Sequence, residues 1–424
     1  MKIALLGNTC NNNFAWMRYF HDLGVDAHLL LYSDEGLPDS NLIHNPEWDT
    51  WEIEKWRSYI HRLPIPNGIE GLVGRPDKIR KRPSRSELHK IFDGYDVYIG
   101  SGISPGLFAR MGKPLTIFYP YSTGIEWVGE GETKKKLKKI NLELPFRWYV
   151  KKMQISGIKA AKVVANTMKD YTQEILDNYS VKTINKYIPQ YYNGEATSYS
   201  VDDDLVKDLL KKTKTSEFSI FSHMRHHWEY NSQLYKKDIW PQFCKNNHWL
   251  IRAFSDFIKI YPKIDSKLIL TAWGKDVESS IQLCSSLDIQ KHVIWLPLLQ
   301  RRQISWILSH ACDLAVGEFV QCKGALWGST AWEALAVGKP VMQTLNFSDQ
   351  DYFNFFGHKS PPVFDVKSPD DVLIQMELAY LNKDMRESIG KLGKEWFDKH
   401  NGIALAKEWL NIIESVQSKQ YVQP

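Results

Sequence analysis

Cysteine is scarce in this chain, and the few cysteines present form no recognisable framework. Only five occur among 424 residues, and no two have the CxxC spacing of a zinc ribbon or a redox pair. An odd number of widely scattered cysteines also argues against a set of disulfides, so we expect a reducing, cytoplasmic environment. The cysteines are Cys10, Cys244, Cys284, Cys312 and Cys322.

Long hydrophobic runs are also missing. No window reaches the ~18 to 20 apolar residues that a transmembrane helix needs. The apolar run after Met1 is too short for a secretory signal, so we interpret it as a buried strand. The net charge of +5 is too small to indicate a nucleic-acid partner. These absences favour a cytoplasmic globular protein.

Several enzyme motifs are absent as well. The chain has no P-loop, GxSxG or HExxH pattern, and the glycine spacing after Gly7 does not fit a dinucleotide fingerprint. The histidines of the row HMRHHW have no carboxylate or cysteine at ligand spacing, so we predict no metal site.

Apolar strands alternate with amphipathic helices along two stretches of the chain. KIALLG and KLILTAWG are apolar runs, whereas HWLIRAFSDFIKIYP places Leu250, Phe254 and Phe257 on one helical face. Uniformly apolar strands are typical of parallel sheets covered by helices on both faces. We therefore predict an α/β fold with two Rossmann-like doubly wound parallel-sheet domains facing a cleft. Ligands bind such sheets at the carboxyl ends of the strands.

A polar, charged segment separates the two stretches, and we interpret residues 193–215 as a linker. The N-terminal Rossmann-like domain is predicted over residues 1–192 and the C-terminal one over 216–400. Residues 401–424 are expected to form a helix and tail, for which packing back on the N-terminal domain is one option.

The most informative segment is GSTAWEALAVGKPVM, which opens at Gly328. We expect a helix to begin near Ser329, with Glu333 in its first turn and Gly338 capping its end. Free N–H groups at such a helix start form an anion site, and a carboxylate one turn in can accept hydrogen bonds from a ribose diol. Together they predict a nucleotide sugar. A capping box between Thr330 and Glu333 is the structural alternative.

This segment resembles the donor-site signature of family 4 glycosyltransferases, which have the GT-B fold. Residues 216–400 follow the family pattern in order and spacing, and the N-terminal half follows it loosely. The resemblance implies a retaining, hexosyltransferase-like enzyme with a UDP-sugar as co-substrate and no metal or other cofactor. It implies that the C-terminal domain binds the donor through the amides of Gly328, Ser329 and Thr330, the carboxylate of Glu333, and the basic pair Arg225 and Lys245, with His223 competing for the place of Arg225.

The sequence departs from the family at the first signature glutamate, where it has Ala325. In the family that acid stabilises charge developing at the anomeric carbon. Glu318, in the same loop, is the candidate catalytic residue, and an ordinary surface glutamate is the alternative. The choice between retention and inversion therefore stays open.

The acceptor is expected to bind the N-terminal domain. The family's histidine in this domain is missing, and Ser122 and Thr123 occupy its region. Together with Asn11, Asn12 and Asn13 after the first strand, they are the candidate acceptor-binding residues. Asparagine-rich turns are also good helix caps, so a purely structural role stays open.

We expect transfer of a sugar to a hydroxyl of a glycan or lipid-linked glycan, in cell-surface polysaccharide or glycoconjugate synthesis. The alternatives are a nucleotide-sugar 2-epimerase of related fold and a non-catalytic homologue that binds sugar nucleotides. Residues 134–152 combine lysines with aromatic side chains, which predicts peripheral contact with the inner face of the cell membrane. A solvated basic face is the alternative there.

Overall fold

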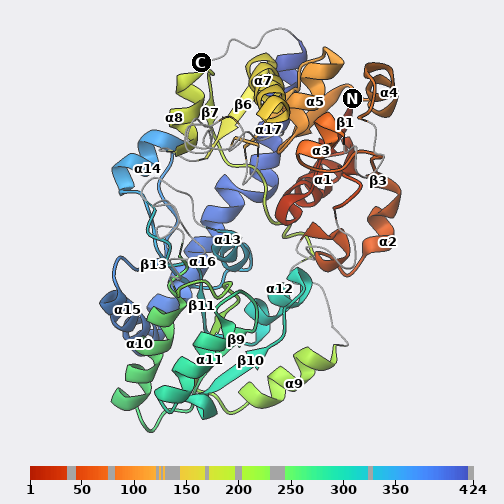
Figure 1. The fold of residues 1–424 in the computed structure, drawn as a ribbon. Helices are drawn as coiled ribbons and strands as arrows, with labels where there is room; N and C mark the ends of the chain where they lie inside the picture. The colour runs from red at the N-terminus through yellow and green to blue at the C-terminus, as the bar shows by residue number, and fades with distance from the viewer. Residues whose placement is uncertain are drawn as a thin grey trace. The chain divides into compact units, whose positions relative to one another are not determined.

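The structure, a computed structural model, divides the chain into two compact units (Figure 1). The N-terminal unit comprises Met1–Tyr192 together with Ile403–Pro424, and the C-terminal unit comprises Asn193–Gly402. The structure describes residues 1–35, 44–74, 82–120, 124–125, 128, 144–167, 171–195, 203–229, 244–322 and 328–418.

A parallel sheet forms the centre of the N-terminal unit. Within the described residues it has seven strands in the order β3-β2-β1-β4-β5-β6-β7, and all neighbouring strands run parallel. The order reverses at β1, which lies between β2 and β4, as in a Rossmann sheet. The strands are β1 (Lys2–Leu6), β2 (Asp26–Leu31), β3 (Ile60–Arg62), β4 (Val97–Gly100), β5 (Ile117–Phe118), β6 (Val163–Asn166) and β7 (Ile184–Asn185).

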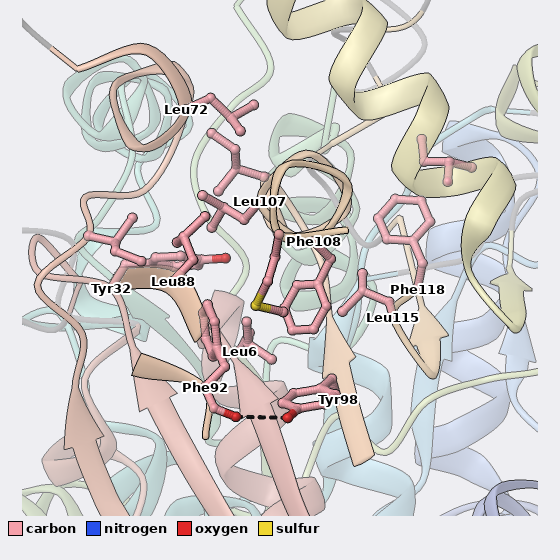
Figure 2. Close-up of a cluster of buried hydrophobic side chains, with 14 of the residues drawn as sticks. Leu6, Tyr32, Leu72, Leu88, Phe92, Tyr98, Leu107, Phe108, Leu115 and Phe118 are labelled. Carbon is pink, nitrogen blue, oxygen red and sulfur yellow. Dashed lines mark hydrogen bonds between the residues drawn. The ribbon is translucent and has the colours of Figure 1, made fainter. Parts of the chain in front are cut away.

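Helices cover this sheet, and an apolar core fills the space beneath them. Figure 2 shows Leu107 and Phe108 packed with Leu6, Tyr98 and side chains from neighbouring helices. The buried hydroxyl of Tyr98 has a hydrogen-bond partner, because it donates to the carbonyl of Phe92 at 2.7 Å. The helices are α1 (Asn12–Asp22), α2 (Ile53–Trp56), α3 (Ile69–Val73), α4 (Arg85–Ile91), α5 (Ser104–Met111), α7 (Leu144–Ala160), α8 (Tyr171–Asn178) and α17 (Gly402–Gln417), with short 3-10 turns at Thr9–Asn11, Pro46–Trp48 and Arg57–Tyr59.

The C-terminal helix α17 belongs to the N-terminal unit although it follows the other unit in sequence. Trp409 of this helix is fully buried, and its indole N–H donates to the carbonyl of Tyr187 at 2.6 Å. Its ring also packs against Trp16 of α1, with 5.6 Å between centroids. A large aromatic side chain thus anchors the end of the chain to the first helix.

A second parallel sheet forms the C-terminal unit. Among the described residues it has six strands in the order β10-β9-β8-β11-β12-β13, again parallel throughout. The strands are β8 (Phe218–Ser222), β9 (Ser266–Thr271), β10 (Val293–Leu296), β11 (Leu314–Val316), β12 (Val341–Gln343) and β13 (Phe364–Asp365). The helices are α9 (Asp204–Thr213), α10 (Asn247–Ile260), α11 (Val277–Ser286), α12 (Arg301–His310), α13 (Ser329–Ala336), α14 (Asp349–Phe356), α15 (Pro369–Leu381) and α16 (Lys383–His400), with a 3-10 turn at Gln290–His292. The predicted pair of Rossmann-like parallel sheets is confirmed.

The segment expected to be a linker contains helix α9. Asp203 caps its start by accepting from the N–H of Val206, and Val206 and Leu209 are buried. Charged residues dominate the sequence here, but apolar side chains at helical spacing give the segment a buried face. None of the helices in the described ranges is long and apolar enough to cross a membrane.

Candidate functional site

Polar side chains gather at the carboxyl edge of the C-terminal sheet. His223 directly follows β8, Glu318 lies two residues beyond β11, and Thr344 directly follows β12. The carboxyl ends of parallel strands lie at one edge of a sheet, which is where such folds bind ligands. Several buried polar atoms of this unit have no hydrogen-bond partner among the described residues, and those in or beside the elements of this edge include Ser222 Oγ, His223 Nδ1, Thr271 Oγ1, Thr330 Oγ1 and Thr344 Oγ1. Buried polar groups normally find partners, so this edge is suited to a polar ligand.

Helix α13 begins at Ser329, as expected, with Gly328 at the N-cap position. No side chain in the described part of the chain caps this end, so its first N–H groups stay available for an anion. Gly338 follows the helix with a φ of +73°, and its N–H donates to Leu335 at 3.0 Å, which closes the other end.

The position of Glu333 differs from the sequence prediction. It is the fifth residue of α13 and so lies in the second turn of the helix. Thr330 lies inside the helix rather than at its cap. The Thr330 hydroxyl is buried without a partner, so the capping box between these two residues does not form. The local pattern fits that motif, but Gly328 takes the N-cap position and Glu333 pairs with side chains from other elements.

Glu333 is 3% exposed and binds two basic side chains. Its Oε2 lies 2.5 Å from His223 Nε2, and its Oε1 accepts from Arg301 Nε at 2.7 Å. Burial alone would raise the pKa of Glu333, but the neighbouring His223 and Arg301 outweigh it and hold the pKa below its ordinary value. The carboxylate is therefore fixed and ionised, and each oxygen keeps a lone pair for a further donor.

His223 is held from several sides. Its carbonyl accepts from the indole N–H of Trp273 at 2.9 Å, and its ring stacks on Phe221 with 5.4 Å between centroids. Because Nε2 faces Glu333, the unpartnered Nδ1 is the ring nitrogen left for a ligand.

Lys245 and Glu318 form an ion pair at the same edge, with side chains 16% and 10% exposed. Lys245 lies just before α10, as predicted. The backbone of Glu318 is fixed by the buried side chain of Gln343, which accepts from its N–H at 2.7 Å and donates to its carbonyl at 2.6 Å. The structure therefore brings His223, Lys245, Glu318, the start of α13 and Glu333 to one edge of one unit.

Arg225 is placed differently from the other donor-binding candidates. It is exposed, with its aliphatic stem against Gly274, and within the described residues it forms no ion pair. The neighbouring His226 points elsewhere, because its Nδ1 is 2.7 Å from Ser280 Oγ. Burial lowers the pKa of His226 to about 4.

No group of three or more potential ligand side chains in the described ranges is arranged to hold a metal ion.

The N-terminal candidates are buried, and their amides mostly hold the turn between β1 and α1. Asn11 Nδ2 donates to the carbonyl of Asn45, Asn12 Oδ1 accepts from the N–H of Asn13, and Asn13 Nδ2 donates to the carbonyl of Gly7. Asn12 Nδ2 and Asn13 Oδ1 are buried without partners among the described residues. The candidates Ser122 and Thr123 lie outside the described residues, as does Ala325, which stands at the position of the family's first signature glutamate.

Two residues of the C-terminal edge were missed by sequence reasoning. Arg301 is the first residue of α12, after the loop that follows β10. Its only sequence signal was that it is a basic residue shortly after an apolar strand. Gln343 ends a buried strand and is itself fully buried, so one polar residue in the apolar run KPVMQTL was its only signal.

Comparison with known proteins places this geometry in a fold class. No protein-family model and no curated protein sequence matches the chain. Solved structures match over nearly its full length. HepE of Anabaena, solved in complex with UDP and glucose, has 12% identity and a TM-score of 0.61, covering 98% of this chain and 100% of its own. A glycosyltransferase from Rickettsia africae has 11% identity and a TM-score of 0.59, covering 98% of both chains.

A Listeria monocytogenes protein assigned as a UDP-N-acetylglucosamine 2-epimerase has 10% identity and a TM-score of 0.51, covering 100% of this chain and 98% of its own. At such identities the similarity shows the fold. The chain has the GT-B fold of two Rossmann-like units, as predicted from the sequence.

Proposed function

We propose that the protein is a glycosyltransferase that moves a sugar from a nucleoside-diphosphate sugar, a UDP-sugar, to an acceptor hydroxyl. The observation that carries the proposal is the C-terminal edge, where an uncapped helix start, Lys245 and an ionised Glu333 lie within one unit. An anion site and a fixed carboxylate are what a diphosphate and a ribose diol require.

The donor would be held by groups with different chemistry. The N–H groups of Gly328, Ser329 and Thr330 would bind the diphosphate with Lys245, and Glu333 would accept from the ribose hydroxyls. His223 would contribute its free ring nitrogen. Arg225 is exposed at the end of β8, where its flexible side chain could close on a phosphate. No metal or other cofactor enters this proposal.

The chemical step is proposed to follow family 4 enzymes, with retention of configuration. The position of the family's first signature glutamate holds Ala325, so Glu318 is the candidate to stabilise charge at the anomeric carbon. Its fixed backbone supports this role, because it limits the positions that the carboxylate can take in the site. Glu318→Gln is then expected to lower turnover by roughly 10²-fold or more.

The acceptor is proposed to be a glycan or lipid-linked glycan that binds the N-terminal unit, in cell-surface polysaccharide or glycoconjugate synthesis. Asn12 Nδ2 and Asn13 Oδ1 are not used within the turn, whereas the Asn11 amide is. A lipid-linked acceptor agrees with the exposed face of α7, where Trp148 is 64% exposed and Lys152 and Lys159 are also exposed. We propose that this face rests on the inner surface of the cell membrane.

A second candidate is a nucleotide-sugar 2-epimerase. The observation that favours it is the buried pair of His223 and Glu333, because epimerisation moves a proton at a sugar carbon and needs acid–base groups. The similarity to the Listeria protein agrees with this alternative.

Incubation with a panel of UDP-sugars separates the candidates. A transferase without acceptor is expected to release free sugar and UDP slowly, and at low UDP-sugar concentration Glu333→Gln should reduce the release while an exposed control, Glu229→Gln, should not. Formation of the 2-epimer without release would support the epimerase instead. UDP binding with neither product would leave a non-catalytic binding protein and contradict the transferase.

A further inference from the structure

Glu318 lies against the start of α13, where an anion would bind. A Cβ atom at position 328 would overlap the Glu318 carboxyl group, so only glycine there leaves room for it. The same carboxylate forms the ion pair with Lys245. A side-chain carboxylate therefore occupies the neighbourhood of both groups that the proposed function assigns to the diphosphate.

This placement is built into the loop after β11. Gln343 binds both the N–H and the carbonyl of Glu318, and its amide also donates to the carbonyl of Thr344 at 3.0 Å. A Cβ atom at residue 317 would overlap Gln343 Oε1, so Gly317 is what admits the amide. Because Gln343 is fully buried, the backbone of Glu318 has little freedom, and only its side chain can turn away from Lys245.

The helix start shows a second sign of a ligand. Thr330 in the first turn is only 7% exposed, and its buried hydroxyl has no hydrogen-bond partner among the described residues. A carboxylate resting beside a helix N-terminus is stabilised by the helix dipole, as a phosphate would be. Two negative groups cannot share that place without strong repulsion.

We propose that Glu318 is an intramolecular competitor for the donor: its carboxylate takes the place of a phosphate at the start of α13, and a nucleoside diphosphate displaces it from Lys245. This inference rests on the proposed function, because it assumes that the same edge binds the diphosphate. It assigns Glu318 a role in binding, which is separate from the role in turnover proposed above. The competition would set donor affinity below what the cationic groups alone would give.

Titration calorimetry of the 424-residue chain with UDP, inorganic pyrophosphate and uridine tests the proposal. Glu318→Gln keeps the shape of the side chain and removes its charge, so UDP and pyrophosphate should bind about tenfold more tightly, which corresponds to about 1.4 kcal/mol. Uridine, which has no phosphate, should bind both proteins equally. Glu318→Ala should give the same direction of change and serves if the glutamine variant does not fold.

The control is Glu229→Gln, which removes one negative charge from an exposed site near α11, where its carboxylate accepts from Ser279. Its UDP affinity should equal that of the unmodified protein, which separates a local effect from a change in net charge.

Equal or weaker UDP binding by both Glu318 variants would overturn the competitor proposal and leave the proposed function intact. Pyrophosphate binding without UDP binding would contradict the proposal that the donor is a nucleotide sugar. Failure of all the proteins to bind UDP and pyrophosphate would overturn both.

Discussion

Glu333→Gln is the sharpest perturbation of the proposed donor site. In the structure the carboxylate is 3% exposed and accepts hydrogen bonds from Arg301 and His223. If its remaining lone pairs accept from the ribose hydroxyls, loss of the charge should cost about 1.5 to 3 kcal/mol of UDP binding, the range for hydrogen bonds to a charged group. That corresponds to about 10- to 150-fold weaker affinity.

The same substitution should also lower stability. Arg301 is 11% exposed and would lose its charged partner, and breaking a buried pair from one side typically costs up to about 3 to 5 kcal/mol. A glutamine oxygen can still accept from Arg301, so we expect a loss of roughly 1 to 3 kcal/mol. A fall in melting temperature alone therefore cannot distinguish a structural from a ligand-binding role for Glu333.

A change in the ligand makes the distinction. UDP and 2′,3′-dideoxy-UDP differ only in the ribose hydroxyls, so calorimetric titration of both ligands into both proteins isolates the contact with Glu333. The unmodified protein should prefer UDP by about 10-fold or more, and Glu333→Gln should bind the two ligands almost equally. If the preference for UDP survives in Glu333→Gln, the carboxylate does not bind the ribose and the donor-site assignment of Glu333 is refuted.

Three further measurements follow from other parts of the structure. Burial raises the pKa of Glu35 to about 7 against opposing backbone hydrogen bonds. The folded protein therefore binds this proton more tightly than the unfolded chain, and stability falls as pH rises through 7. Chemical denaturation from pH 5 to 8 should show a loss roughly 2 kcal/mol larger in the unmodified protein than in Glu35→Gln, and parallel curves would contradict it. Trp409→Ala should lower the free energy of unfolding by about 3 to 5 kcal/mol and Trp409→Phe by less, because the ring is fully buried; equal losses would mean that ring size is unimportant. The protein should sediment with anionic but not neutral vesicles, more weakly with Lys152→Glu or at high salt, and equal sedimentation with both would exclude the α7 surface as a membrane contact.

The fold was predictable because its signal is local and repeated. The inner strands are largely buried on both faces, so their sequences are mainly apolar, as in KIALL and FSIFS. Amphipathic helices between such strands leave few topologies, since parallel crossovers are right-handed and short. Helix α9 was not predicted because its two buried residues are outnumbered by lysines and aspartates. In such a helix most residues lie on the exposed face, so the amino-acid composition of the segment resembles that of a polar linker.

The candidate site was predictable only in part, because its side chains are paired across the sequence. The start of α13 follows from local sequence, but the environment of Glu333 depends on residues 110 and 32 positions away. Local reasoning offered a capping box between Thr330 and Glu333 as the structural alternative to a donor site, since T-x-x-E fits that motif within one turn. Tertiary partners and the N-cap glycine decide otherwise. Arg301 and Gln343 could not be recognised as neighbours of the site before the strands were aligned.

The charges at the C-terminal edge explain why Glu318 is more informative than any cation there. Lys245 is paired with Glu318 and Arg301 with Glu333, so these two pairs offer a diphosphate little excess positive charge, and its binding depends on how each group is placed. Removing a cation would weaken binding whether the residue touches the ligand, positions a neighbour or merely supports the fold. Structural damage seldom improves affinity. A gain in UDP binding on removing one carboxylate therefore indicates that this carboxylate opposes the phosphate at the start of α13, as competition for Lys245 predicts.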